Sequence, residues 1–145
     1  MTEFQDDPDI LNDESLLRRV ATNNPDMLKT DSVSGIQRPT SAAFSFQKDG
    51  LSVYRNKKLK EFHLNPIDIL SGPDQIVVSL TVTQVRECNG LGVCDDPWPK
   101  GIRDQEHIRN AAHALIVGWQ SLSRREQKDH SRYLARNCQI IDISF

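Results

Sequence analysis

The longest nearly uninterrupted apolar run of this chain is Ala111-Ala112-His113-Ala114-Leu115-Ile116-Val117-Gly118-Trp119. Only 37% of the 145 residues are hydrophobic, so a run of this length is expected at the centre of the core. We predict a central buried strand at 112–118. A strongly charged segment follows it, and then a second apolar run at 139–145.

The charged segment carries a helix-start signal. Ser123 precedes Glu126 by three residues, which is the spacing of a capping box. This predicts a helix at 124–137, and the apolar run after it predicts a returning strand at 139–144. A buried strand, a covering helix and a strand that closes the sheet form the simplest arrangement of these pieces.

Shorter elements are predicted upstream. Asp49-Gly50 between two short runs is a hairpin signal, with strands at 42–47 and 51–55. The spacing of Leu and Phe at 57–63 predicts a short helix, and 91–94 predicts a short strand.

Two segments leave their type open. Residues 15–21 suit either a strand or a short helix. At 74–88 the apolar residues alternate with Ser and Thr as in a strand, but Pro73-Asp74 resembles a helix start and Asn89-Gly90 a helix stop. We favour a helix that covers the sheet at 74–88.

These elements predict an α+β fold: one compact domain at 14–145, with a small mixed β-sheet covered by two or three helices. Residues 1–13 contain Pro8 and lack periodicity, and the first fifteen residues hold six acidic side chains and no basic one. We expect 1–13 to be a flexible, disordered acidic tail; the alternative is an arm that covers a basic surface of its own domain or of a partner. Residues 23–37, rich in Asn, Asp, Ser, Pro and Gly, are expected to form a long loop.

The composition also suggests where the protein acts. No stretch reaches the roughly 18 apolar residues of a membrane span, and the acidic start is unlike a secretory signal. Three cysteines, an odd number, suggest free thiols. We therefore expect a cytoplasmic protein without a membrane partner.

A metal site is one candidate for chemistry. Cys88 and Cys94 are separated by five residues, as are His107 and His113. Thiolates and imidazoles are zinc ligands, but the usual spacings are shorter. We favour no metal and no other cofactor, and read the cysteines as small buried hydrophobes.

A basic stripe is the second candidate. Arg125, Lys128, Arg132 and Arg136 fall on one side of the predicted helix. Such a stripe can bind phosphate, of nucleic acid or of a ligand, or it can be a solvated helix face. Three lysines of the short helix would extend it if the fold brings them near: Lys57, Lys58 and Lys60.

Catalysis is the third candidate. Cys94 lies beside Asp95 and Asp96, and a histidine such as His113 or His107 could serve as a base. Neighbouring carboxylates raise a thiol pKa, which argues against Cys94 as a nucleophile. The chain carries no nucleophile elbow, phosphate loop, dinucleotide fingerprint or zinc-protease motif. A histidine on an apolar strand is more often part of the core.

Two short segments of the chain resemble the NAD-binding segments of ADP-ribosyltransferase-like proteins. One is an arginine on an early element, Arg18 or Arg19, and the other is Thr40-Ser41 at the start of a predicted strand. Those families also carry a late acidic residue in an ExE or QxE motif, and nothing after Glu126 matches it. The family is therefore not assigned.

Docking is the last candidate. Trp98 stands between two prolines, and Phe4 lies in the acidic segment; tryptophan is enriched at interface hot spots. Our leading hypothesis is a small intracellular accessory or adaptor protein that binds another macromolecule, most simply a protein. The alternative is a small transferase or hydrolase acting on a nucleotide or nucleic acid, with a histidine base and phosphate held by the basic helix.

Overall fold

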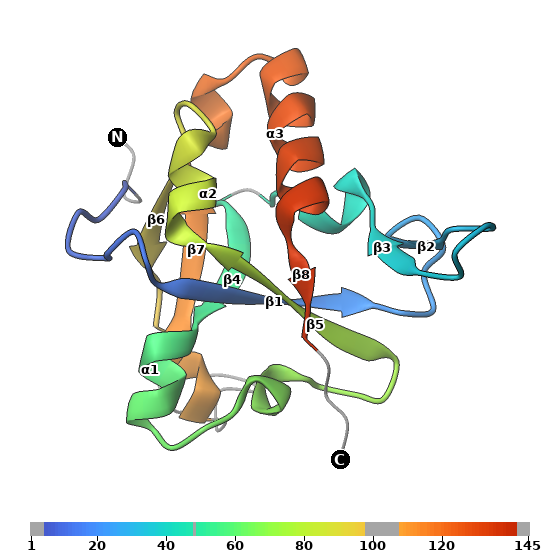
Figure 1. The fold of residues 1–145 in the computed structure, drawn as a ribbon. Coiled ribbons are helices and arrows are strands. Elements are labelled where there is room, and N and C mark those ends of the chain that lie inside the picture. Colours follow the sequence, from blue (N-terminus) through green and yellow to red (C-terminus); the bar gives the residue numbers. More distant parts are fainter. Residues whose placement is uncertain (1–4, 48, 98–107, 142–145) are drawn as a thin grey trace.

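A computed structural model describes residues 5–47, 49–97 and 108–141 of the chain. It confirms a single α+β domain, built on a six-stranded sheet and a small two-stranded one (Figure 1). In spatial order the large sheet comprises β6 (Gly92–Asp95), β7 (His113–Val117), β4 (Leu51–Arg55), β1 (Ser15–Ala21), β5 (Gln75–Thr81) and β8 (Gln139–Ile140). The small sheet pairs β2 (Leu28–Thr30) with β3 (Gln37–Pro39). All pairings among the described residues are antiparallel, where a mixed sheet was expected.

Helices cover both faces of the large sheet. The α-helices are α1 (Asn56–Glu61), α2 (Val82–Glu87) and α3 (Arg124–Asn137). The short 3₁₀ helices are η1 (Ser41–Phe44), η2 (Pro66–Ile69), η3 (Ile108–Ala112) and η4 (Trp119–Ser121). No helix in the described ranges is long and apolar enough to cross a bilayer.

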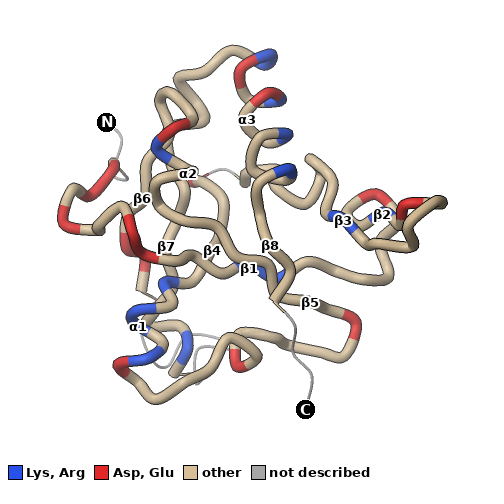
Figure 2. The backbone as a smooth tube through the Cα atoms, in the orientation of Figure 1, with Lys and Arg blue, Asp and Glu red and all other residues tan. Residues whose placement is uncertain are grey.

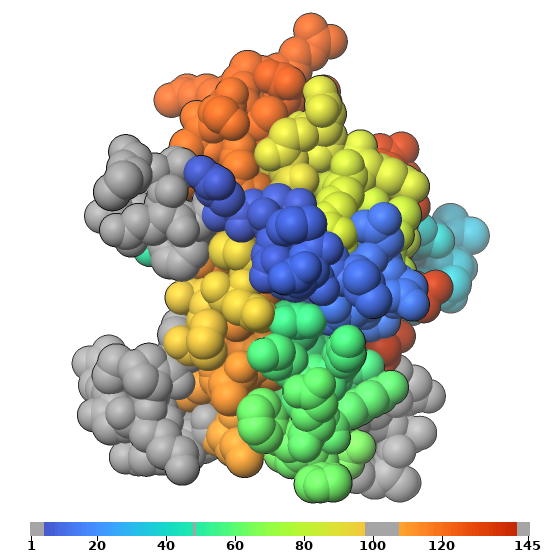
Figure 3. Space-filling view, turned by 90° about the vertical axis from the view of Figure 1, so that its left-hand side faces the viewer, coloured from blue at the N-terminus to red at the C-terminus, as the bar shows by residue number. Residues whose placement is uncertain are grey.

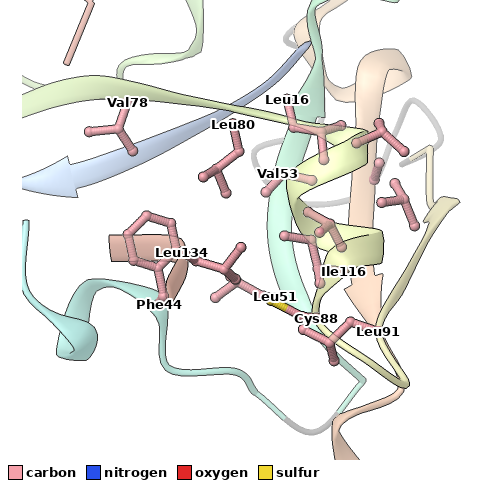
Figure 4. Packing of buried hydrophobic residues seen from close by; sticks show 14 of the residues in the cluster. Leu16, Phe44, Leu51, Val53, Val78, Leu80, Cys88, Leu91, Ile116 and Leu134 are labelled. Carbon is pink, nitrogen blue, oxygen red and sulfur yellow. The ribbon is translucent and has the colours of Figure 1, made fainter. Parts of the chain in front are cut away.

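Strand alternation divides the core in two. Leu16 of β1 belongs to the larger cluster, which α2, α3 and η1 cover with residues such as Phe44 and Leu134 (Figure 4). The next residue, Leu17, points to the other face and packs with Leu59 of α1. Because neighbouring strand residues face opposite ways, α3 and α1 lie on opposite faces of the sheet.

The apolar run that opened the sequence analysis forms β7, and all five of its residues are buried. It lies second from the edge, between β6 and β4, whereas β4 and β1 are the innermost strands. The prediction of a buried strand is confirmed and its central position is wrong. Ala114 and Ile116 pack in the larger cluster, and Leu115 and Val117 pack with Cys94 on the other face, so β7 is buried on both faces without lying at the centre.

Several local predictions are confirmed. The capping box at the start of α3 is formed, with Ser123 Oγ accepting from Glu126 N at 3.1 Å and Glu126 Oε1 accepting from Ser123 N at 3.1 Å. Residues 15–21 are a strand. The short elements α1, β4 and β6 lie close to where they were predicted. The returning strand predicted at 139–144 is confirmed only at its start, since β8 ends at Ile140 and residues 142–144 lie outside the described ones.

The segment 74–88 is half strand and half helix, so the prediction of one helix is wrong. β5 runs to Thr81, which is also the N-cap of α2. Thr81 Oγ1 accepts from Gln84 N at 3.1 Å, and Gln84 Oε1 accepts from Thr81 N at 3.0 Å. This second capping box, inside an alternating pattern, is where the strand ends and the helix begins.

The predicted strand at 42–47 is wrong as well, since Ser41–Phe44 form η1. Two side chains take the carbonyls that a sheet would need. Arg18 Nε donates to Ala43 O at 2.7 Å, and Ser131 Oγ donates to Phe44 O at 3.0 Å. Gly50 still makes a tight turn before β4, at φ +146°, where a Cβ would lie 2.6 Å from Ile116 O.

The described part of the N-terminal segment is packed on the domain, where a flexible tail was expected. Ile10 is 1% exposed and belongs to the larger core cluster. Asp6 Oδ1 accepts from Val93 N at 2.8 Å and from Arg86 Nη2 at 3.1 Å. Figure 3 shows this segment lying across the surface between α2 and α1. The Asp6 carboxylate therefore binds within the chain, and the packed part of the chain begins before residue 14.

Candidate functional site

The basic row on α3 is the starting point for a site, because its side chains point away from the core. Ser131 and Leu134 form the buried side of the helix. Lys128, Arg132 and Arg136 are exposed at four-residue intervals, so they form one row along the outer surface. Figure 2 shows basic residues along α3 and on the neighbouring β3.

Beside this row lies a pocket of about 560 Å³, between the C-terminal half of α3 and the strands β3 and β8. Its cationic lining residues are Arg38, Arg132 and Arg136, and its apolar ones include Ile36 and Ile140. These two isoleucines are 54% and 40% exposed. Large aliphatic side chains exposed beside guanidinium groups are typical of an interaction surface.

A second pocket of about 340 Å³ adjoins the first at Ser41, and Gln127, Lys128 and Ser131 of α3 line it. The wall of the second pocket that residues 41–46 form is held in place from the core side. The carbonyls of residues 43 and 44 accept the hydrogen bonds from Arg18 and Ser131 described above. We call the two pockets together the α3 groove.

The α3 groove has a one-sided charge. Four cations line it, namely Arg38, Lys128, Arg132 and Arg136, and none of the described lining residues of either pocket is acidic. Asp129, outside the lining, lies 3.7 Å from Arg132, but both side chains are more than half exposed. Such exposed pairs contribute little and leave the cation available.

The end of α3 could repel an anion, since the last carbonyls of a helix carry partial negative charge. Three donors offset this effect. Cys138 N donates to Leu134 O at 2.9 Å, Asn137 Nδ2 to Tyr133 O at 2.8 Å, and Gln84 Nε2 to Asn137 O at 3.3 Å. The groove therefore presents side-chain cations beside carbonyls that already have partners.

Not all of the predicted stripe belongs to the groove. Arg125 is exposed one turn before Lys128 and lines neither pocket. Lys57, Lys58 and Lys60 lie on α1, which covers the opposite face of the sheet. The fold does not bring these lysines near the stripe, so they do not extend it.

His113, the candidate base, is 1% exposed. It lies opposite Tyr54 on β4, and the two rings contact edge to face with centroids 5.5 Å apart. Its Nδ1 lies 2.9 Å from Asp96 O and 3.3 Å from Asp96 Oδ2. A carbonyl oxygen only accepts, so Nδ1 carries the proton. Burial lowers the pKa of His113, against the opposing effect of Asp96.

His113 and the basic helix do not share a site. Tyr54 packs with α1 residues in the smaller cluster, whereas Ala114, the neighbour of His113, packs in the cluster that α3 covers. A base at His113 and a phosphate held by Arg125, Lys128 and Arg132 would therefore lie on opposite faces of the sheet.

The candidate metal ligands are also kept apart. Cys88 packs on the α3 face and Cys94 on the other. Within residues 5–47, 49–97 and 108–141, no three histidine, cysteine or acidic side chains gather as a metal site would require. His107, Trp98 and Phe4 lie outside the described residues.

The remaining chemical candidates have structural partners. Burial, with Asp96 and Asp95 beside it, raises the pKa of the Cys94 thiol to about 11, in the direction expected from the sequence. Arg18 donates to Ala43 O and, from Nη1, to Ser52 O at 2.8 Å. Its guanidinium therefore holds η1 against the sheet and is not placed to grip a nucleotide.

Sequence reasoning missed half of the α3 groove. Ile36 lies in the segment predicted as a loop, and Arg38 directly follows that segment. Ile140 was predicted only as part of a closing strand. The one available signal was an isoleucine and an arginine two residues apart in an otherwise small and polar stretch.

No family model, curated protein or solved structure matches the chain. The function therefore has to be argued from the geometry of the α3 groove.

Proposed function

We propose that this protein is a binding module that holds an acidic segment of a partner protein in the α3 groove. The observation that carries the proposal is the lining: four cations, exposed aliphatic side chains and no carboxylate among the described lining residues. Charge complementarity gives register and specificity, and aliphatic contacts add affinity. The three free thiols support a reducing, cytoplasmic location for this binding.

A protein segment fits this lining better than a nucleic acid does. Single-stranded nucleic acids are usually held by aromatic platforms on which bases stack. The described lining has one aromatic ring, Phe46, and that ring is stacked on Trp119 with centroids 5.0 Å apart. Ile36 and Ile140 instead offer aliphatic surface.

The test is a binding measurement with a charge-reversed groove. The probe is a fluorescein-labelled pool of octapeptides built from Asp, Glu, Ile and Val, followed by fluorescence anisotropy. We expect the wild-type protein to bind the pool and the Arg132→Glu/Arg136→Glu variant to bind it at least about tenfold more weakly, which corresponds to about 1.4 kcal/mol.

The matched control is Arg124→Glu/Arg125→Glu, which makes the same change in net charge on the same helix outside both pockets. It should bind clearly more tightly than Arg132→Glu/Arg136→Glu does, because Arg125 lies about 10 Å along the helix from Arg132 and exposed charges at that distance are largely screened. Equal loss in both variants would mean that net charge alone attracts the peptides, and the proposal would then be wrong.

A further inference from the structure

We infer, on the basis of the proposed function, that the α3 groove selects an extended segment whose acidic residues stand at every second position. The inference starts from the spacing of Lys128, Arg132 and Arg136, which lie four residues apart on one helix. A helix rises about 1.5 Å per residue, so neighbouring cations of the row are about 6 Å apart along the axis.

An extended chain repeats at nearly the same interval. Its residues rise about 3.3 Å each, so side chains on one side recur about every 6.6 Å. Three acidic side chains at alternate positions therefore meet the three cations one to one. A run of consecutive acidic residues would send every second carboxylate away from α3.

The opposite wall suits the intervening side chains. Residues 36–41 face α3 across the first pocket, and Ile36 and Pro39 are the apolar residues of that wall, beside its one cation, Arg38. Because successive side chains of an extended segment point to opposite sides, the residues between the acidic ones point toward this wall. Aliphatic side chains there would bury the exposed surface of Ile36. The selected pattern is acidic, aliphatic, acidic, aliphatic, acidic.

The length of the groove sets the number of residues. Lys128 and Arg136 are eight residues apart on α3, about 12 Å along the helix. Five extended residues span about 13 Å between the first and the fifth. Ser41, which both pockets share, lies between the two ends. The recognised core is therefore five residues long.

The experiment compares two peptides of identical composition and charge, each flanked by Gly-Ser. One has the core Asp-Ile-Asp-Ile-Asp and the other the core Asp-Asp-Asp-Ile-Ile. Fluorescence anisotropy should show the alternating peptide binding about tenfold more tightly. Lys128→Gln should reduce this preference, whereas Arg125→Gln, which is on the same stripe outside both pockets, should leave it unchanged.

The other outcomes separate the two claims. Equal binding of the two peptides overturns the spacing and leaves the proposed function standing. If neither peptide binds, both the spacing and the proposed function fail. If a five-nucleotide oligodeoxythymidine binds more tightly than the alternating peptide and loses affinity in Lys128→Gln, the occupant is a nucleic acid and the inference is overturned.

Discussion

Two charged regions of this molecule are used in opposite ways. In the first, Arg55 donates through Nη2 to Glu14 Oε2 and through Nη1 to Asp95 Oδ1, both at 2.9 Å, and the Arg55 and Glu14 side chains are 8% and 4% exposed. In the second, Arg132 on α3 is 63% exposed and its one described ion pair, with Asp129, is 3.7 Å long.

The difference indicates which charges hold the fold and which remain available to a partner. Buried charges persist in proteins where partners satisfy them, and Arg55 has both carboxylates within hydrogen-bonding distance. Exposed cations on a helix contribute little to folding. The four cations of the α3 groove can therefore serve binding without supporting the domain.

The largest expected effect comes from breaking the buried region. Arg55→Leu leaves Glu14 buried without its guanidinium partner, and we expect the free energy of unfolding to fall by about 3–5 kcal/mol. Urea denaturation followed by circular dichroism measures it. The double variant Arg55→Leu/Glu14→Leu should recover part of the loss, because no unpaired charge remains buried. A double variant as unstable as the sum of two single losses would contradict this account.

An intermediate effect is expected from His113, a buried titratable group on the α1 face. Burial lowers its pKa below the ordinary value of 6.5, so between those two values the unfolded chain binds the proton and the folded chain does not. Stability should therefore be complete above pH 6.5 and fall as the pH drops below it, by at most about 1.4 kcal/mol per pH unit.

The measurement compares urea midpoints of wild type and His113→Gln from pH 7.5 to 5. The variant should lose less stability on acidification than wild type does. Parallel pH profiles would show that His113 does not titrate between the folded and unfolded states.

The smallest effect on stability is expected in the groove. Arg132→Gln/Arg136→Gln should change the free energy of unfolding by no more than about 0.5 kcal/mol, because both side chains are exposed. Thermal unfolding should show nearly the same midpoint as wild type. A loss of about 2 kcal/mol or more would mean that these arginines stabilise the fold, and the contrast between the two regions would disappear.

Local signals carried the parts of the fold that were predicted correctly. The Ser123–Glu126 capping box located α3, and the apolar run located β7, since both depend on residues adjacent in the sequence. Errors arose where distant side chains intervene. Arg18 and Ser131 hold residues 43 and 44 in η1 rather than in a strand, and they lie 25 and 87 residues away along the chain.

The sequence by itself determined the α+β class, the helix α3 and the row of cations on it, because helix periodicity places residues four apart on one side. Only the tertiary structure decided what this row faces. It put Ile36 and Arg38 across from Arg132 and Arg136 to make the groove, and it placed His113 on the opposite face of the sheet. Such pairings depend on contacts between residues far apart in the chain, which no local pattern encodes.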